Sequence, residues 1–335
     1  SEVSETGVTV PIVFMGLPLF MVRDEQGRSR VFHNVCSHRG MQLVCESTPS
    51  GLTIRCPYHR WGYDLTGRLK ATPNIGGMGV HEVAGFDCGQ HGLKEVRSEE
   101  YLGIIFINLS GEALPLETQF QSITQRWQAL AGDDFSEILV SDSGESGALE
   151  LVVNCNYKLA VENYCESYHL PSIHPDLNSY SPLAQHYNLV VDNVASGQGT
   201  HSYDLGRGDA PPLPVFPHWD NERLKTGEYL SLYPNVLLGL QADHFFAIIL
   251  TSDAPDKTRE RLRFFYAGDD ALGYATLARR QSLHAAWSQV FSEDISVVEG
   301  MQRGRASHAF EGGVFSPVMD VPTHHFHQWF ARGYQ

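Results

Sequence analysis

The sequence feature that most restricts the fold is a pair of short loops, each of which carries one cysteine and one histidine. The first loop reads Cys36-Ser-His38-Arg-Gly40 and the second reads Cys56-Pro-Tyr-His59-Arg60. Two thiolates and two imidazoles can hold either a zinc ion or a Rieske 2Fe–2S cluster, in which the cysteines bind one iron and the histidines the other. Zinc sites usually pair cysteine with cysteine and histidine with histidine, so the mixed loops favour the cluster.

A second candidate metal site lies in residues 162–174, which read Glu-Asn-Tyr-Cys-Glu-Ser-Tyr-His-Leu-Pro-Ser-Ile-His. Since residues three apart share a face of a helix, we expect Glu166 and His169 to point the same way, on a helix that Pro171 ends. His169, His174 and a distant carboxylate would form the facial triad of mononuclear non-haem iron(II). Taken alone, two such histidines are more often core or surface residues than metal ligands.

Composition and charge exclude several classes of function. The 335 residues suffice for two domains that each bury a core. A net charge of -15 opposes nucleic-acid binding, which requires clustered lysine and arginine, and no apolar segment is long enough for a membrane span. The chain opens without a signal-peptide pattern and its six cysteines do not form a secreted disulfide framework, so we expect a cytoplasmic protein.

Periodicity divides the chain into two predicted domains, at residues 1–110 and 111–335. The first domain reads as a meander of short antiparallel strands, expected at 8–16, 17–23, 29–35 and 101–109. The second combines helices, expected at 119–131, 162–169 and 271–307, with strands at 149–153, 229–240, 245–251 and 259–267. Residues 175–228 read as a long loop that either lines a site or moves.

The two cysteine–histidine loops resemble the Rieske loops of the ring-hydroxylating oxygenase family, in which a tryptophan, here Trp61, follows the second loop. The resemblance implies a 2Fe–2S cluster that is held by Cys36, His38, Cys56 and His59. One departure is Arg60, where family members commonly carry glycine, so either the turn differs or Arg60 faces outward. The first loop also comes early for the family, which indicates either a compact start or an N-terminal segment absent from the sequence.

The resemblance extends to the second half of the chain. Residues 162–174 and the later run 293–302 are similar to the family's mononuclear iron motif and to the helix that supplies its carboxylate. This similarity implies three iron(II) ligands, namely His169, His174 and Asp294. Glu293 is the less favoured alternative to Asp294, and without the resemblance both would read as solvated helix acids.

Two further residues, Asn163 and Glu166, receive catalytic roles from the resemblance. Glu166 stands where the family has an acid that bridges an iron-binding histidine, here His169, to a Rieske histidine of the neighbouring subunit. The resemblance therefore implies a head-to-tail homotrimer in which the cluster of one subunit serves the iron of the next. Electrons would come from NAD(P)H through a separate flavin and iron–sulfur reductase or a ferredoxin.

The fold that the resemblance implies is α+β, with an N-terminal all-β Rieske domain and a C-terminal helix-grip-like catalytic domain containing an antiparallel sheet. The implied activity is that of a terminal oxygenase, which uses O2 to hydroxylate a small organic substrate. Glu166, where most members have aspartate, is similar to the branch that acts on quaternary amines, so monooxygenation or N-demethylation of a methylated amine or betaine is favoured. Two alternatives stay open: an aromatic ring-hydroxylating dioxygenase, and a Rieske electron-transfer protein without oxygenase activity.

Several other residues carry weaker signals. Five aromatic residues are candidates for a cage around a cationic substrate, although each reads more readily as a core residue: Tyr168, Tyr233, Phe245, Phe246 and Trp287. His324, His325 and His327 have no accompanying acid or cysteine, so we expect a packing helix there rather than a third metal site. Cys155 and Cys165 read as small buried residues.

Overall fold

The computed structural model describes residues 3, 5–204 and 211–333, and it divides the chain into two compact units. The first unit is Ser1–Gln119 and the second is Phe120–Gln335. Each unit has hydrophobic clusters of its own, as expected for domains that form separate cores. Among the described residues, no helix is both long and apolar enough to cross a membrane.

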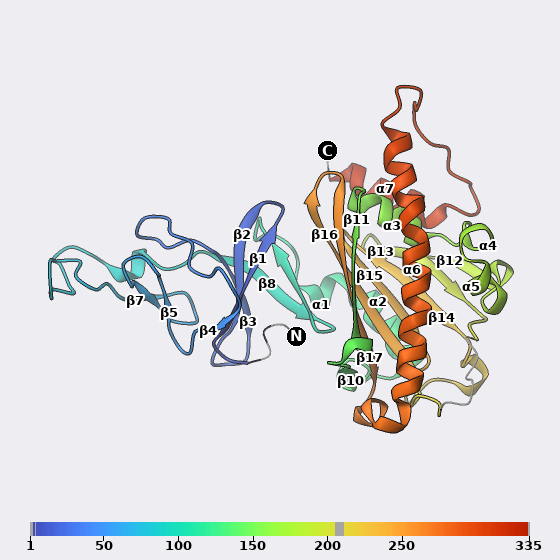
Figure 1. Ribbon diagram of the computed structural model, residues 1–335, viewed down its shortest axis with the longest axis horizontal. Coiled ribbons are helices and arrows are strands. Elements are labelled where there is room, and N and C mark those ends of the chain that lie inside the picture. The colour runs from blue at the N-terminus through green and yellow to red at the C-terminus, as the bar shows by residue number, and fades with distance from the viewer. Residues whose placement is uncertain (1–2, 4, 205–210, 334–335) are drawn as a thin grey trace. The chain divides into compact units, whose positions relative to one another are not determined.

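The first unit is built from short antiparallel strands, as the sequence predicts (Figure 1). Its larger sheet has the order β4-β1-β2-β3-β8-β9. The strands of this sheet are β1 (Val8–Phe14), β2 (Leu17–Arg23), β3 (Ser29–His33), β4 (Thr48–Pro49), β8 (Glu95–Tyr101) and β9 (Ile104–Asn108). A smaller sheet contains β5 (Ile54–Arg55), β6 (Gly62–Tyr63) and β7 (Leu69–Ala71). The two cysteine–histidine loops follow β3 and β5, and the short helix α1 (Leu116–Gln119) ends the unit.

The single buried strand expected at 101–109 is wrong. Tyr101 ends β8, and the chain turns at Leu102 and Gly103, which have φ values of 50° and 73°, before β9 begins at Ile104. Sequence patterns conceal this turn because Leu102 adopts a left-handed backbone conformation that is usual only for glycine or asparagine. The apolar run therefore contains the turn of a hairpin and its second strand, while the first strand, β8, precedes it.

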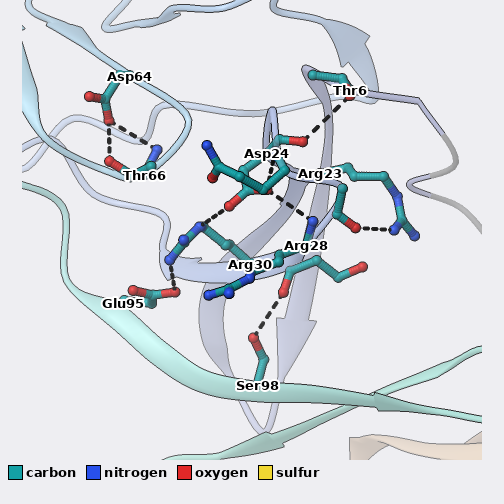
Figure 2. A network of polar contacts seen from close by, with 12 residues as sticks. Thr6, Arg23, Asp24, Arg28, Arg30, Asp64, Thr66, Glu95 and Ser98 are labelled. Carbon is teal, nitrogen blue, oxygen red and sulfur yellow. Dashed lines mark hydrogen bonds and ion pairs between the residues drawn. The ribbon is translucent and has the colours of Figure 1, made fainter.

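A polar network fastens the turn between β2 and β3 to β8 (Figure 2). The buried Asp24 carboxylate accepts two backbone N–H donors of this turn, each at 2.9 Å, and pairs with Arg30 at 2.7 Å. Arg30 also pairs with Glu95 in β8 at 2.8 Å. Burial alone would raise the pKa of Asp24, but the hydrogen bonds and the charge of Arg30 lower it. An ionised side chain thereby holds the predicted turn.

The second unit is an antiparallel sheet with helices packed on it, which confirms the predicted α+β class. The strand order is β10-β17-β16-β15-β14-β13-β12, and β11 pairs with β17 along the same edge as β10. The strands are β10 (Leu139–Ser141), β11 (Ala148–Val153), β12 (His186–Val191), β13 (Ala195–Thr200), β14 (Gly227–Leu232), β15 (Val236–Gln241), β16 (His244–Ala254) and β17 (Lys257–Ala267).

Helices cover both faces of this sheet. Successive residues of a strand point to opposite faces, and in β16 the ring of Phe246 packs on Trp287 of α6 (Leu277–Arg305), whereas Phe245 packs on Trp127 of α2 (Gln121–Ala131). Figure 1 shows α6 running along the length of the sheet. Helices α3 (Tyr157–Cys165) and α7 (Val321–Arg332) contact each other, and α3 also contacts α6. The second candidate metal site combines Asp294 of α6 with two histidines, His169 and His174, of the segment that follows α3.

Two expectations for the second unit are wrong. The strand expected at 229–240 is two strands, because the chain reverses between β14 and β15. The loop expected at 175–228 contains the helix α5 (Pro175–Tyr180) and the strands β12 and β13, while its residues 205–210 lie outside the described part. Strand β13 reads Ala-Ser-Gly-Gln-Gly-Thr and has no large apolar residue. Close packing requires at least one of its glycines, because a Cβ on Gly197 would lie 2.0 Å from the backbone oxygen of Tyr229. Hydrophobic periodicity therefore does not reveal this strand.

Candidate metal centres

The two cysteine–histidine loops have the same backbone turn. The N–H of Gly40 donates to the carbonyl of Cys36 at 3.0 Å, and the N–H of Arg60 donates to the carbonyl of Cys56 at 3.0 Å. Gly40 and Arg60 both have left-handed backbones, with φ values of 73° and 64°. The turn is thus the same in spite of the arginine, and the Arg60 side chain is exposed, which is the second of the two possibilities that the sequence raises.

The donor groups of the two loops come together at one end of the first unit's smaller sheet. The thiols of Cys36 and Cys56 are buried, and the rings of His38 and His59 lie 4.7 Å apart between centroids. Nδ1 of His59 is buried and has no hydrogen-bond partner among the described residues. A buried nitrogen without a partner is costly unless a ligand satisfies it, so this donor set fits a metal cluster.

Tyr63 contacts the first cysteine of this centre. Its hydroxyl lies 3.1 Å from Sγ of Cys36 and 2.9 Å from Oγ of Ser37, and the Ser37 N–H donates to it at 3.1 Å. Ser37 Oγ in turn donates to the carbonyl of His91 at 2.6 Å. Burial raises the pKa of Tyr63, and its hydrogen bond to Cys36 raises it further, so the hydroxyl stays protonated and can donate to sulfur. Sequence patterns indicate only a core tyrosine here.

The second centre brings together the three predicted iron ligands of the catalytic unit. His169 directly precedes α4 (Leu170–Ile173), His174 lies between α4 and α5, and Asp294 belongs to α6. Oδ1 of Asp294 lies 3.0 Å from Nε2 of His174 and 3.7 Å from Nε2 of His169. The three ligand atoms lie within 4.8 Å of one another, which is close enough for one metal ion to bind all three.

The helix expected to carry Glu166 and His169 is wrong in its extent. Helix α3 ends at Cys165, and Glu166 has an extended backbone with φ −119° and ψ 160°. Pro171 does not end a helix but stands in the first turn of α4, a position that suits its missing N–H. Glu166 reaches His169 by turning back on the chain: its carboxylate accepts the N–H groups of Tyr168 and His169, and Oε1 lies 2.6 Å from Nδ1 of His169.

A second carboxylate, that of Glu293, holds the other histidine. Oε2 of Glu293 lies 2.7 Å from Nδ1 of His174, and Oε1 accepts a hydrogen bond from Gln289 at 2.9 Å. Glu293 and Asp294 are adjacent on α6, so they leave the helix in different directions and contact opposite nitrogens of one imidazole. Burial alone would lower the pKa of His174, but Asp294 and Glu293 together raise it. Sequence patterns suggest Glu293 only as an alternative ligand, and its contact with Nδ1 is a different role.

Each candidate histidine therefore has the same arrangement. Nδ1 of each histidine contacts a carboxylate of its own, Glu166 for His169 and Glu293 for His174. Nε2 of each histidine faces Asp294. Carboxylate–histidine pairs of this kind fix the tautomer and ring orientation of metal-binding histidines. The arrangement fits a metal ion that the two Nε2 atoms and Oδ1 would hold, beside the adjacent cavity.

A cavity of about 50 Å³ adjoins Asp294 and the two histidines. Its aromatic wall consists of Tyr164, Tyr229, Trp287 and Phe291. Its polar lining includes Asn163, Ser181, His186 and Gln198. Of the five aromatic residues named as cage candidates only Trp287 lines this cavity, and the core reading that the sequence favours is confirmed for three of the other four. Tyr168 is 58% exposed, and the other three pack elsewhere in the core.

A smaller cavity of about 20 Å³ shares four lining residues with the first, namely Asn163, Tyr164, Phe291 and Asp294. Most of its remaining lining is aliphatic, and the exception is Glu260 on β17. Burial raises the pKa of Glu260 to about 7, and the negative charge of Asp294 contributes to this rise.

The remaining singled-out residues lie outside both centres. The three histidines near the C-terminus belong to α7, which is the packing helix that the sequence predicts. His327 lies 3.0 Å from Oε1 of Glu162, whose carboxylate also pairs with Arg305 at the end of α6. Cys155 and Cys165 are fully buried, as predicted, and burial raises the pKa of each thiol to about 12.

These two donor sets, one with two cysteines and two histidines and one with two histidines and a carboxylate, are those of a Rieske-type non-haem iron oxygenase. The family comparison agrees. Residues 140–335 match the ring hydroxylating alpha subunit (catalytic domain), and residues 1–91 match the Rieske [2Fe-2S] domain. The chain belongs to the ring-hydroxylating alpha-subunit family. It is an oxidoreductase, and the cofactors of this class are a Rieske cluster and non-haem iron, with electrons from a separate reductase.

Relatives with assigned activities cover most of the chain. The carnitine monooxygenase oxygenase subunit of Escherichia coli (strain K12) is 24% identical in an alignment of 342 positions that covers 99% of this chain and 85% of that protein. The chloroplastic choline monooxygenase of Arabidopsis thaliana is 26% identical over 311 residues, which are 91% of this chain and 68% of that protein.

Solved structures of the class share the fold. The quaternary ammonium Rieske monooxygenase CntA in complex with L-carnitine aligns with a TM-score of 0.76 and 21% identity, over 100% of this chain and 86% of that chain. Naphthalene 1,2-dioxygenase with bound indole aligns with a TM-score of 0.70 and 17% identity, over 98% of this chain and 84% of that chain. The two-unit architecture is therefore common to enzymes that act on different substrates.

Proposed function

We propose that this chain is the terminal oxygenase component of a system that monooxygenates a small quaternary amine or betaine. In this proposal a 2Fe–2S cluster is held by Cys36, His38, Cys56 and His59, and a mononuclear iron(II) by His169, His174 and Asp294. The observation that carries it is the convergence of the two Nε2 atoms and Oδ1 beside a cavity with an aromatic wall. The iron supplies the activation of O2, and the rest of the work falls to the protein's own side chains.

The carboxylates around the histidines keep the site in one geometry. Glu166 and Glu293 each accept the Nδ1–H of one histidine, so both Nε2 lone pairs point toward the metal position. Asn163 lines both cavities beside Asp294, where its amide can donate to an oxygen atom bound in the cavity. The aromatic wall gives the same space an apolar side, against which the methyl groups of a substrate can pack.

Electrons would reach the iron through Glu166. Its carboxylate contacts Nδ1 of His169 on one side and remains 14% exposed on the other, so it is available to a second hydrogen-bond donor. We assign that donor to a Rieske histidine of a neighbouring copy in a head-to-tail homotrimer. The solved structure of a quaternary ammonium Rieske monooxygenase, which is 20% identical to this chain, is described as giving insight into inter-subunit electron transfer in that protein, and this supports the proposed arrangement. The electrons would enter from NAD(P)H through a flavin and iron–sulfur reductase or a ferredoxin.

A quaternary amine is the favoured substrate because the cavity has an aromatic wall and because relatives of the chain are named for quaternary amines. Relatives over 91% to 99% of the chain are named carnitine and choline monooxygenases. Aromatic rings attract cations through their π faces, whereas they bind uncharged methyl groups only by packing. Oxygen would be inserted into a C–H bond next to the nitrogen, and the resulting carbinol would lose its hydroxyl proton as its C–N bond breaks, which gives an aldehyde and a tertiary amine.

The test is a substrate panel with the iron-loaded protein, a surrogate reductase and O2. Choline, glycine betaine and carnitine are offered beside naphthalene and toluene. The proposal expects an aldehyde and a tertiary amine from at least one of the three cations, with no ring product. A panel that yields only cis-diols or phenols would instead support an aromatic ring-hydroxylating dioxygenase. Full activity after loss of the mononuclear iron would support a Rieske electron carrier, against which the family match at 140–335 already counts.

We also place the protein in a reducing compartment, the cytoplasm. All six cysteines are free, and two of them belong to the cluster site. Free buried thiols are usual in proteins of reducing compartments.

A further inference from the structure

Trp287 is a cavity residue whose indole N–H has a dedicated partner. It stands seven residues before Asp294 on α6, which is about two helical turns, so both side chains leave the same face of the helix. Trp287 is only 4% exposed, and part of its surface lines the cavity beside the candidate iron ligands. Its Nε1 donates to Nε2 of His244 at 3.1 Å.

His244 is held in one tautomer by its neighbour in the chain. It is fully buried as the first residue of β16, and its Nδ1 lies 2.7 Å from Oδ1 of Asp243. Burial alone would raise the pKa of Asp243, but the hydrogen bond with His244 lowers it, so the carboxylate is ionised and accepts Nδ1–H. Nε2 is then the acceptor that the indole N–H requires.

Aromatic packing removes the remaining freedom of the indole. Tyr203 lies parallel to it at 5.8 Å, and Phe246 packs edge-on at 4.8 Å. Neither of these rings lines the cavity, whereas Tyr229, which packs edge-on at 5.8 Å, does. A hydrogen-bonded and packed indole keeps one orientation toward the cavity. The bond to a histidine that is itself bonded to a carboxylate also shifts electron density onto the ring.

We propose that Asp243 and His244 are positioning residues that hold Trp287 as the recognition surface for the cationic head of the substrate. This inference rests on the proposed function, because it presupposes that the substrate carries an ammonium group. Tryptophan is the strongest aromatic partner for a cation, and the contact strengthens as the cation loses its water on binding. The sequence Asp243-His244, which patterns indicate only as a turn, thereby determines substrate specificity from outside the cavity.

The test measures binding of two probes that have nearly the same shape but differ in charge. Choline and its uncharged analogue 3,3-dimethylbutan-1-ol are titrated by calorimetry into the anaerobic, iron-loaded protein. We expect wild type to prefer choline. Trp287→Leu and His244→Phe should each reduce this preference by about 5- to 30-fold, which is the range that a cation–π contact of this kind supplies. The affinity for the uncharged analogue should change by less than about twofold in both variants.

Two further variants separate positioning from general loss of structure. His244→Gln keeps an acceptor for the indole N–H and should restore much of the preference that His244→Phe loses. Trp127→Phe is the matched control, because the Trp127 indole also donates to a buried acceptor, Glu228 at 3.1 Å, but does not line the cavity. It should leave the preference unchanged.

The outcomes distinguish this inference from the proposed function. The inference would be overturned if His244→Phe left the preference for choline unchanged. It would also be overturned if this variant weakened the affinities for both probes by the same factor. If wild type shows no preference for choline yet converts a quaternary amine, the inference fails and the proposed function stands. If the loaded enzyme converts only uncharged substrates, both fail.

Discussion

Oε1 of Glu166 lies 2.6 Å from Nδ1 of His169, although the two residues share no helix. The extended backbone of Glu166 and the short helix α4 create this contact, and Glu293 makes the equivalent contact with His174 at 2.7 Å. The two carboxylates are therefore a natural pair for comparison. Both orient a histidine, but only Glu166 is assigned to the route of electrons between subunits.

Glu166→Gln should slow electron transfer from the cluster to the iron by about 10- to 100-fold while both metals stay bound. The amide keeps the shape but cannot accept two N–H donors as strongly as the carboxylate. The measurement is the rate of cluster reoxidation after the reduced protein is mixed with O2 and substrate. Glu293→Gln is the control, and it should affect this rate much less. Equal rates in wild type and Glu166→Gln would rule out the bridge.

Asp294→Ala should empty the mononuclear site and abolish turnover while the visible spectrum of the cluster persists. Asp294 is the residue on which both Nε2 atoms converge, so its removal leaves only two ligands. Glu293→Ala should retain the iron with an affinity reduced by about 10- to 100-fold, since only the support of His174 is lost. Iron titration followed by EPR of the nitric oxide adduct checks both variants. Stronger iron loss in Glu293→Ala would reverse the assignment.

Tyr63→Phe should lower the reduction potential of the cluster. The Tyr63 hydroxyl lies 3.1 Å from Sγ of Cys36 and would donate to this sulfur when it is a cluster-bound thiolate, and a donor to sulfur stabilises the more negative, reduced form. A redox titration followed by EPR gives the potential. Tyr274→Phe, at a 91% exposed position of the catalytic unit, is the control and should leave the potential unchanged. A potential that stays constant in Tyr63→Phe would show that the hydroxyl does not act on the cluster.

Arg60→Gly should stabilise the first unit by about 1 kcal/mol, because Arg60 has a left-handed φ of 64° that glycine adopts without strain. Arg39→Gly in the twin loop is the matched control. Its backbone is not left-handed, and Gly40 already occupies the strained position, so this change should destabilise by about 0.5–1 kcal/mol. Thermal unfolding monitored by the visible absorption of the cluster compares the two. Destabilisation by both substitutions would show that Arg60 makes contacts that outweigh its strain.

Glu260→Gln should stabilise the protein more at pH 8 than at pH 5.5. The pKa of Glu260 is raised from 4.5 to about 7, so the folded state binds its proton more tightly than the unfolded chain. Between these two values, the contribution of Glu260 to the free energy of unfolding falls as the pH rises. Glutamine has no proton to lose, so its advantage over glutamate grows over the same range.

Melting temperatures after chelation of the mononuclear iron test this pH dependence. Glu299→Gln is the control, because hydrogen bonds from the Asn154 backbone and side chain lower the pKa of Glu299 from its usual 4.5. Glu299 is therefore ionised in both the folded and the unfolded chain at the two pH values, so the stability that this substitution removes should be the same at pH 5.5 and pH 8. An advantage of Glu260→Gln that is the same at pH 5.5 and pH 8 would contradict the raised pKa.

Residue spacing predicts which side chains come together better than it predicts the elements that carry them. The two cysteine–histidine loops and the pair His169 and His174 are short-range patterns, so their candidate roles can be inferred from sequence. Helix α3, however, ends at Cys165 rather than at Pro171, because Glu166 uses its carboxylate to accept N–H groups of the next residues. Such competition between a side chain and a helix is not visible in periodicity.

Contacts between distant segments are the part that sequence cannot supply. Glu293 and His174 are 119 residues apart, and Trp287 and His244 are 43 apart. Their meeting depends on the packing of α6 on the sheet, and one strand of that sheet, β13, has no large apolar residue and so no hydrophobic pattern. The same limit explains the cage, since which aromatic residues line the cavity follows from how helix and sheet pack.

The most direct test of the two-centre account is the content of iron and acid-labile sulfide in the anaerobically purified protein, together with the EPR spectrum of its dithionite-reduced form. The account predicts about three irons and about two sulfides per chain, with a Rieske-type signal. Two irons with the same signal would contradict the mononuclear site at His169, His174 and Asp294. Zinc without sulfide would contradict the cluster at Cys36, His38, Cys56 and His59, and with it the proposed function.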